Sequence, residues 1–332
     1  MNGLPIGLAW QGGPTPGLEN HEPPQDNLVG HWDFTDYTQL IGSLSGSWSG
    51  SYLAGTDPIG RCKNKAPSGT TNSKLGQWVR AETDDKRPLW FTGGANGNAY
   101  AKFDNSSHTQ SLVCRSTDYT NWGAMGVDLL SATKLMAENI SIFIVGEPLD
   151  DDTDGTPENA FSYWGYYDRY NGTPADEIVR FNLERDDDDD IHAVWNIEAG
   201  VVTPNTVDSV NVTRHWNSGG PSIINIQTHQ TVGGSHIYTN NSADTGQSIY
   251  SVGSGPVAQN PWADLDPVDY DDSLTCSIGI GGRVNASGQI LSDSFEGKIY
   301  EVLVYSSRLS EEDRLALTYY LANKYAIELI EG

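Results

Sequence analysis

Short runs of β-type residues, separated by turn-forming residues, constrain the fold of this chain more than any other feature. Residues 140–146, 178–183, 192–197 and 223–228 are rich in β-branched and aromatic residues, and turn-forming residues follow each run. The 36 glycines and 16 prolines among 332 residues fit a chain with many turns. Because no helical pattern lies between the runs, we expect two antiparallel sheets packed face to face rather than a parallel α/β sheet.

Two runs are the most apolar. Residues 140–146 are almost wholly apolar, which predicts a central strand covered on both faces. Residues 295–305 predict a long closing strand. Strict alternation along it would give two sets of side chains on opposite faces: Ile299, Glu301, Leu303 and Tyr305 on one, and Tyr300, Val302 and Val304 on the other.

One segment carries a helical pattern. Ser310 is a suitable N-cap, and Asp313 three residues later completes a start that resembles a capping box. Apolar residues then recur at spacings of three or four, at Leu315, Tyr319, Ala322 and Tyr325. The spacing predicts a helix over about 311–324 that covers one edge or mouth of the sandwich.

The first residues differ from the rest. Residues 1–27 hold many prolines and glycines and no period, so we expect an extended arm. We predict a single sandwich domain over residues 28–332, with a possible insertion at 150–220. The arm still carries four large apolar residues, and we predict that they bind a partner: Leu4, Ile6, Leu8 and Trp10.

The charge of the chain limits its partners. Nineteen Lys and Arg against 44 Asp and Glu give a formal net charge of −25. We therefore expect neither nucleic-acid binding nor attachment to anionic membranes, since both need clustered cations. No apolar stretch approaches the ~20 residues of a membrane helix, and the first residues do not resemble a signal peptide.

Motifs of known catalysts are missing from the sequence. The nearest approach to paired carboxylates on one strand is the acidic run at 184–189, which has no apolar residues between its charges. There is no His-Glu-x-x-His motif and no phosphate-binding Gly-rich motif. We therefore expect no catalytic residues and predict that the chain is not an enzyme.

Three acidic loops are candidates for weak Ca²⁺ binding, because hard cations take six to eight oxygen ligands. The alternative is that these loops are simply solvated and keep crowded copies apart. No cofactor is required on either interpretation. The candidate ligands are Asp150, Asp152 and Asp154 in the first loop, Asp187 and Asp189 in the second, and Asp269 and Asp271 in the third.

An aromatic cluster is a candidate contact surface. Its residues are Trp164, Tyr166, Tyr167 and Tyr170, next to Tyr163. Three interpretations stay open: part of the core, a protein interface, or a surface that stacks on sugar rings.

The last forty residues carry the motif that suggests a family. The run Phe-Glu-Gly-Lys-Ile-Tyr-Glu at 295–301, then Leu-Ser at 309–310, and Tyr-Leu-Ala-Asn-Lys-Tyr at 320–325 resemble the closing motif of concanavalin A-like, laminin G-like jelly-roll domains. Weaker matches lie at 101–106, 139–148 and 236–241, so the resemblance covers roughly residues 28–327. It implies an all-β, antiparallel two-sheet jelly-roll sandwich with one C-terminal α-helix.

Together with Leu-Val-Gly-His-Trp-Asp at 28–33, this ending is of the type found in virion proteins of tailed bacteriophages. The resemblance implies a structural protein on the surface of the phage particle, made in the host cytoplasm. We expect a capsid decoration or head protrusion, attached by its arm to the major capsid protein or another virion subunit, and assembled as a homo-oligomer. The alternative is a carbohydrate-binding adhesin on a tail fibre or cell surface.

Overall fold

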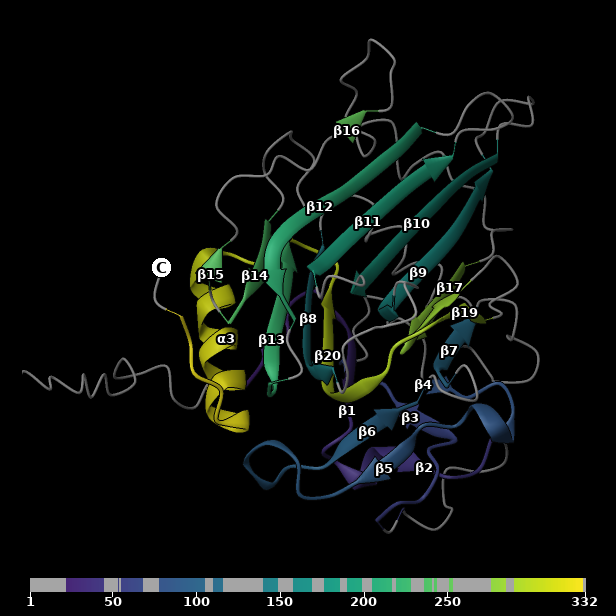
Figure 1. Ribbon diagram of the computed structural model, residues 1–332, viewed down its shortest axis with the longest axis vertical. Helices are drawn as coiled ribbons and strands as arrows, with labels where there is room; N and C mark the ends of the chain where they lie inside the picture. The colour runs from purple at the N-terminus through teal and green to yellow at the C-terminus, as the bar shows by residue number, and fades with distance from the viewer. Residues whose placement is uncertain are drawn as a thin grey trace, which may run out of the picture.

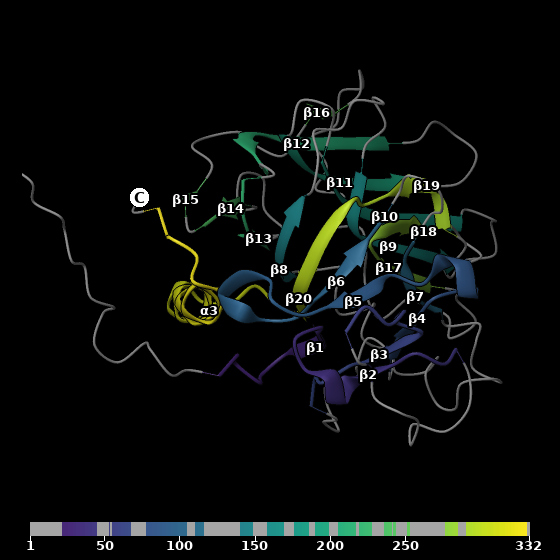
Figure 2. The same cartoon turned by 60° about the horizontal axis from the view of Figure 1, so that its bottom comes forward.

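Two β-sheets face each other in the computed structural model, and a helix lies against one of them (Figures 1 and 2). The structure describes residues 22–44, 53, 55–67, 78–104, 110–115, 140–148, 158–168, 176–185, 190–198, 205–216, 219–227, 236–240, 242–243, 251–252, 276–284 and 290–330. Apart from one parallel bridge, every strand pair in these segments is antiparallel. The predicted fold class, an all-β two-sheet sandwich with a C-terminal helix, is confirmed.

The smaller sheet has β8 and β20 at its centre. Its order is β15–β14–β13–β8–β20–β6–β5, and β1 also pairs with β20. The predicted central strand at 140–146 is therefore confirmed as β8. The bounds are β1 (Leu28–Asp33), β5 (Leu89–Phe91), β6 (Tyr100–Phe103), β8 (Ser141–Pro148), β13 (Ser222–Gln227), β14 (His236–Thr239), β15 (Ser242–Ala243) and β20 (Gly297–Tyr305).

The larger sheet follows the order β16–β12–β11–β10–β9–β17–β7–β4–β3–β2. Two further strands, β18 and β19, form a hairpin whose second strand meets β9. The bounds are β2 (Leu40–Ile41), β3 (Arg61–Lys63), β4 (Trp78–Arg80), β7 (Leu112–Arg115), β9 (Glu158–Asp168), β10 (Asp176–Arg185), β11 (Asp190–Glu198), β12 (Asn205–His215), β16 (Ser251–Val252), β17 (Cys276–Ile280), β18 (Gly282–Val284) and β19 (Ile290–Ser294).

The region 150–220 supplies the longest strands of the larger sheet. Strands β9 to β12 run antiparallel in succession and continue the sheet beyond β17 (Figure 1). The description of this region as an insertion, and of residues 1–27 as a separate arm, stays a prediction.

The main core lies between the two sheets. Inward side chains of the smaller sheet, such as Ile142 and Ile144, meet Phe161, Phe181 and Leu183 of the larger one, and all are almost completely buried. Burying side chains of this size stabilises the fold by ~1.5–3 kcal/mol each, before ordering costs. This apolar layer holds the sandwich together.

The closing strand departs from the predicted alternation. The register of β20 against β8 shifts between Ile299 and Glu301, so a β-bulge interrupts the period of two. As a result Ile299 packs in the same core as Val302 and Val304. The expectation that Ile299 shares a face with Leu303 and Tyr305 is wrong. The other side of β20 presents Tyr300, Leu303 and Tyr305 to the helix.

The helix α3 (Glu311–Tyr325) covers the outer face of the smaller sheet, where Leu317, Leu321 and Tyr325 pack against Phe143 and Val145. The predicted N-cap is confirmed, because Ser310 accepts a hydrogen bond from the Asp313 N–H at 3.1 Å. Among the described residues, no helix is long and apolar enough to cross a membrane. Short 3₁₀ turns occur at Tyr37–Gln39, Asp84–Lys86 and Ala95–Gly97.

Candidate functional site

Most of the sequence-predicted site residues lie outside the described residues. This holds for the four apolar residues of the arm, for all the candidate calcium ligands and for one aromatic, which are Leu4, Ile6, Leu8, Trp10, Asp150, Asp152, Asp154, Asp187, Asp189, Asp269, Asp271 and Tyr170. Their proposed roles stay predictions.

The other aromatic candidates lie on β9, and their positions along the strand assign them to its two faces. Tyr163 is part of the buried core. Because successive residues of a strand belong to opposite faces, Trp164 and Tyr166 are positions of the other face, while Tyr167 is a position of the same face as Tyr163. The backbone register places Trp164 opposite both Arg180 of β10 and Ser277 of β17.

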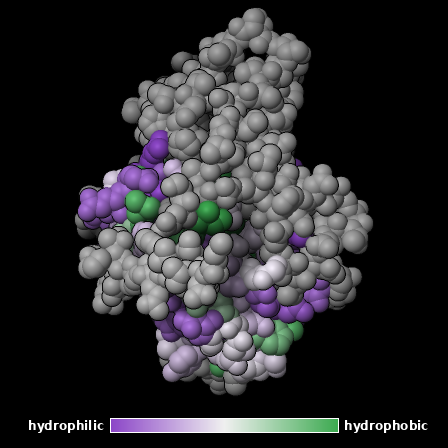
Figure 3. Space-filling view, turned by 60° about the vertical axis from the view of Figure 1, so that its left-hand side comes forward, coloured by the Kyte–Doolittle hydropathy of each residue, from purple (hydrophilic) through white to green (hydrophobic). Residues whose placement is uncertain are grey.

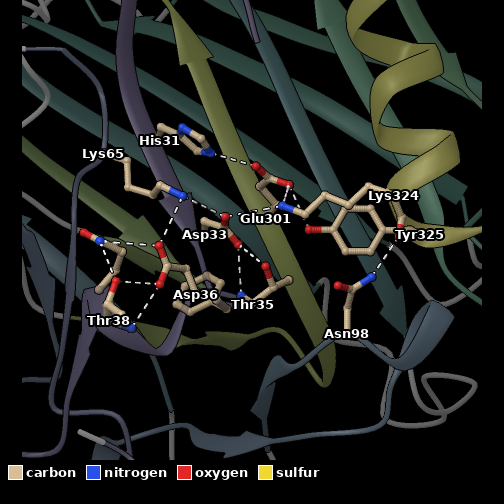
Figure 4. Close-up of polar contacts among 12 residues, drawn as sticks. His31, Asp33, Thr35, Asp36, Thr38, Lys65, Asn98, Glu301, Lys324 and Tyr325 are labelled. Carbon is tan, nitrogen blue, oxygen red and sulfur yellow. Dashed lines mark hydrogen bonds and ion pairs between the residues drawn. The ribbon is translucent and has the colours of Figure 1, made fainter. Parts of the chain in front are cut away.

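A buried polar cluster joins β1, β20 and α3 (Figure 4). Strand pairing places His31 of β1 opposite Leu303 and Asp33 opposite Glu301, and the last turn of α3 supplies two further polar groups. We call this cluster the β1–β20–α3 network. It consists of His31, Asp33, Lys65, Glu301, Lys324 and Tyr325.

Glu301 lies at the centre of the network and is completely buried. One of its oxygens is 2.7 Å from His31 Nε2. The other accepts hydrogen bonds from Lys324 Nζ and from the Tyr325 hydroxyl, both at 2.8 Å. Three partners therefore replace the water that this carboxylate loses on folding.

Asp33 is the second buried carboxylate. Its Oδ2 lies 3.0 Å from Lys65 Nζ and 3.3 Å from Lys324 Nζ. Its Oδ1 accepts hydrogen bonds from the backbone N–H and the hydroxyl of Thr35. Lys324 thus bridges both buried carboxylates, while Lys65 also lies 3.4 Å from Oδ2 of Asp36.

The electrostatics keep Glu301, Asp33 and Lys324 ionised. Burial alone would raise the pKa of Glu301, but the hydrogen bond with His31 and the charge of Lys324 outweigh it and hold the pKa below its ordinary value. Burial opposes ionisation of Asp33 too, and Lys324 and Lys65 outweigh it, so the pKa of Asp33 lies well below its ordinary value. Burial would lower the pKa of Lys324, whereas Glu301 and Asp33 raise it well above its ordinary value.

Backbone contacts hold the network in place. The side-chain amide of Asn64 accepts from the His31 N–H at 2.9 Å and donates to the Val29 carbonyl at 3.0 Å. Asn98 donates to the carbonyl of Lys324 at 2.8 Å. Loops that follow β3 and precede β6 therefore fix both β1 and the end of α3.

The network contains a possible set of metal ligands. Ligand atoms of His31, Asp33 and Glu301 all lie within 4.8 Å of one another. However, the ammonium of Lys324 contacts both carboxylates and already supplies the positive charge that a metal would bring. These residues fit an internal ion network better than a metal centre, because a divalent cation would be repelled by two lysines.

The pair of Tyr325 and Glu301 also resembles a known catalytic arrangement, since some glycosidases use a tyrosine as nucleophile. Tyr325 is 1% exposed, so a sugar cannot reach its hydroxyl. Burial, followed by the charges of Glu301 and Asp33, raises its pKa well above the ordinary value. This pair therefore stabilises the contact between helix and sheet.

Sequence reasoning did not assign this network. All of its residues except Lys65 stand inside the motifs that suggested the family: His31 and Asp33 in the opening motif, and Glu301, Lys324 and Tyr325 in the closing one. The signal that could have found them is the presence of charged residues inside the opening and closing motifs, namely Asp33, Glu301 and Lys324.

The comparisons with known proteins show structural likeness only. No protein-family model matches the chain, and no curated protein does so either. Among solved structures, Trypanosoma rangeli sialidase with 2,3-difluorosialic acid matches at 12% identity and a TM-score of 0.40, covering 91% of this chain and 34% of that one. Leech intramolecular trans-sialidase matches at 14% identity and a TM-score of 0.33, covering 58% of this chain and 25% of that one.

A third structure is a single carbohydrate-binding module. It is the CBM40 of Ruminococcus gnavus IT-sialidase bound to α2,3-sialyllactose, at 14% identity and a TM-score of 0.32, covering 59% of this chain and 88% of that one. The chain spans about a third of the length of the first sialidase. No phage protein is among these three neighbours.

The comparisons correct one prediction. We expected a chain that is not an enzyme, but sialidases, which are enzymes, are among the solved structures that it resembles. The exclusion of enzymatic activity therefore does not stand. At 10–14% identity and TM-scores of 0.40 or less, the likeness assigns no reaction and no substrate to this chain.

Proposed function

We propose that the protein is a structural component of the surface of a tailed-bacteriophage particle, a capsid decoration or head protrusion held by its N-terminal arm. Its partners would be the major capsid protein or another virion subunit. The proposal rests on the resemblance of the opening and closing motifs and on one structural observation about the base of the arm.

That observation is the way in which the chain enters the body. Strand β1 starts one residue after the predicted arm, and Leu28 is buried. The carbonyl of Asn27 accepts a hydrogen bond from the Ser306 N–H at 2.9 Å. Three residues further on, His31 enters the β1–β20–α3 network, which ties β1 to a central strand and to the helix. A tether that joins such a firmly held strand can transmit load to the whole sandwich.

The charge supports the same proposal. A net charge of −25 gives the body strong mutual repulsion, which keeps neighbouring particles apart. In the described part of the face in Figure 3, hydrophobic areas are small and lie separately among hydrophilic residues. A surface of this kind suits a body that faces solvent while the apolar arm makes the attachment.

Removing the apolar residues of the arm tests this function. The variant carries Leu4→Ser, Ile6→Ser, Leu8→Ser and Trp10→Ser, and purified shells that lack the protein are mixed with it. We expect occupancy of the shells to fall at least ten-fold. The control carries Glu19→Gln and Glu22→Gln in the same arm and should bind as the unaltered chain does. Equal occupancy by both variants would reject the arm as the attachment.

A carbohydrate-binding adhesin is the second candidate. The observation that favours it is the register of β9, which separates Trp164 and Tyr166 from the core position Tyr163 and places Trp164 in line with Arg180. Aromatic rings beside polar groups suit the faces of sugars. The CBM40 neighbour, bound to sialyllactose, suggests sialylated glycans as the first to try.

A glycan array tests the second candidate. The full chain is compared with Trp164→Ala combined with Tyr166→Ala, and with the control Tyr37→Ala, which removes a half-exposed tyrosine outside the larger sheet. Binding that the double variant loses and the control keeps would support an adhesin. An array without signal for the full chain would reject it.

A further inference from the structure

Two register partners of the described chain both carry buried polar atoms without a partner. The side chain of Asn159 on β9 has neither a donor for its Oδ1 nor an acceptor for its Nδ2, and the hydroxyl of Ser294 on β19 has no partner. Both residues are 0% exposed. They are also register partners, joined by the parallel bridge between β19 and β9. Residues paired in this way lie side by side on the same face of a sheet.

The position of this site in the fold is unusual. Ser294 is the last residue of β19, directly before the chain leaves the larger sheet to form β20. On β9, the register against β10 shifts between Leu183 and Glu184, which leaves Ala160 as an extra residue. A bulge and a strand end therefore meet here, and the backbone ladder between β19 and β9 consists of a single pair.

The unpartnered atoms define the ligand that the site needs. Asn159 Nδ2 requires an acceptor, whereas Asn159 Oδ1 requires a donor, and Ser294 Oγ can serve as either. A ligand that both donates and accepts satisfies all three atoms. A bare metal ion would leave the Nδ2 donor unsatisfied. The adjacent residue Glu158 also has its Oε2 only 3.6 Å from Nη1 of the buried Arg185, whose positive charge opposes a cation.

We propose that Asn159 and Ser294 bind a buried water molecule, which links β9 to β19 where the chain crosses between the sheets. Water is the smallest ligand with both capacities, and polar sites sealed inside proteins hold it as part of the structure. The bound water supplements the single backbone pair and so fixes the strand that leads into β20.

A crystal structure of the full chain at a resolution that shows ordered waters, grown with Mn²⁺ present, tests the proposal. We expect a peak within hydrogen-bond distance of both Asn159 and Ser294 that gives no anomalous signal. The peak should vanish in Asn159→Leu. It should persist in the control Thr239→Val, which removes a buried hydroxyl on another strand. An anomalous Mn²⁺ peak, or a direct hydrogen bond between the two side chains without a peak, would overturn the proposal.

A double-mutant cycle gives a second readout in solution. Asn159→Leu alone should lower the melting temperature by a few degrees, because it leaves the Ser294 hydroxyl buried with one partner fewer. Adding Ser294→Ala should then recover part of the loss, since no polar atom is left to satisfy. Strictly additive losses would show that the two side chains share no ligand and would contradict the proposal.

Discussion

The side chain of Lys324 links three elements of the fold, β1, β20 and α3. Its ammonium lies within 3.3 Å of both buried carboxylates of the network, while its stem belongs to the helix that covers the smaller sheet. The same ammonium group therefore neutralises the buried carboxylates of Asp33 on β1 and Glu301 on β20, and so holds α3 against these two strands. Removing one partner of a buried ion pair costs far more than removing an exposed pair, because the remaining charge stays desolvated.

The first prediction concerns this lysine. Replacing Lys324 by Met keeps the apolar stem but leaves Glu301 and Asp33 with too few positive partners. We expect the free energy of unfolding to fall by about 3 kcal/mol in urea denaturation. As the matched control, Asp84→Asn breaks an ion pair with Arg87 in which the aspartate is 78% exposed, and it should change stability little. Equal effects of the two variants would show that the network does not hold the helix.

The second prediction concerns pH. The pKa values of Glu301 and Asp33 are lowered by folding from ordinary values of 4.5 and 3.8, so the stability they contribute is present above those values and is lost as the pH falls through and below them. The pKa of Lys324 is raised from 10.5, so its contribution is present below pH 10.5 and is lost as the pH rises beyond it.

These three groups therefore contribute a constant amount between about pH 6 and pH 9. Urea denaturation of the full chain across pH 3 to 9 measures the slope, and Glu301→Gln should make the fall on the acid side shallower. An acid slope that Glu301→Gln leaves unchanged would contradict the assignment.

Among the elements, the helix α3 has two ends that differ in how favourably they are capped. Ser310 caps the N-terminus with the hydrogen bond that its sequence pattern predicts. At the other end, Ala326 adopts a left-handed conformation with φ of 54°, which a residue with a Cβ tolerates poorly. The helix therefore has a good N-cap, but the residue that follows its last turn is strained.

The third prediction uses these two ends. Ser310→Ala should destabilise the protein by ~1 kcal/mol, because it removes a cap. Ala326→Gly should stabilise it by ~0.5–1 kcal/mol, because glycine takes a positive φ without a steric cost. Urea denaturation of the two variants measures both changes. Destabilisation by Ala326→Gly would show that this position is not left-handed in solution.

The elements that sequence predicts well are those set by local pattern. The places of the helix, the central strand β8 and the closing strand β20 follow from capping and from runs of apolar residues, which act over a few positions. The buried face of the helix differs from the predicted stripe, since Leu317 and Leu321 are buried whereas Leu315 and Tyr319 are only partly so. The bulge between Ile299 and Glu301 escapes prediction because it is set by pairing with β8, about 150 residues earlier in the chain. Likewise, the network requires Asp33 and Lys324, which the fold brings together from opposite ends of the sequence.

In the molecule as a whole, the acidic residues include two contrasting groups. Asp33 and Glu301 are buried and paired inside the fold, whereas the aspartate runs near residues 150, 187 and 270 are the candidates for calcium. The sequence brings oxygen ligands together there, but the number of ligands depends on how the loops fold, which local pattern does not define.

The fourth prediction addresses calcium. If one of these acidic loops binds Ca²⁺, thermal melts should shift upward with millimolar Ca²⁺ and return after EDTA, as binding to the folded state requires. The same amount of NaCl by ionic strength serves as the control. Equal shifts with NaCl would indicate charge screening, and an unchanged melting temperature would reject the site.

Electron microscopy of phage particles purified from a lysate that contains this protein tests the proposed place on the virion surface. We predict density for the acidic sandwich on the outside of the shell, with the residues before Leu28 directed toward the shell and the larger sheet exposed. Particles that lack the protein, or density for its body on the inner side of the shell, would contradict the proposal that it is a building block of the virion surface.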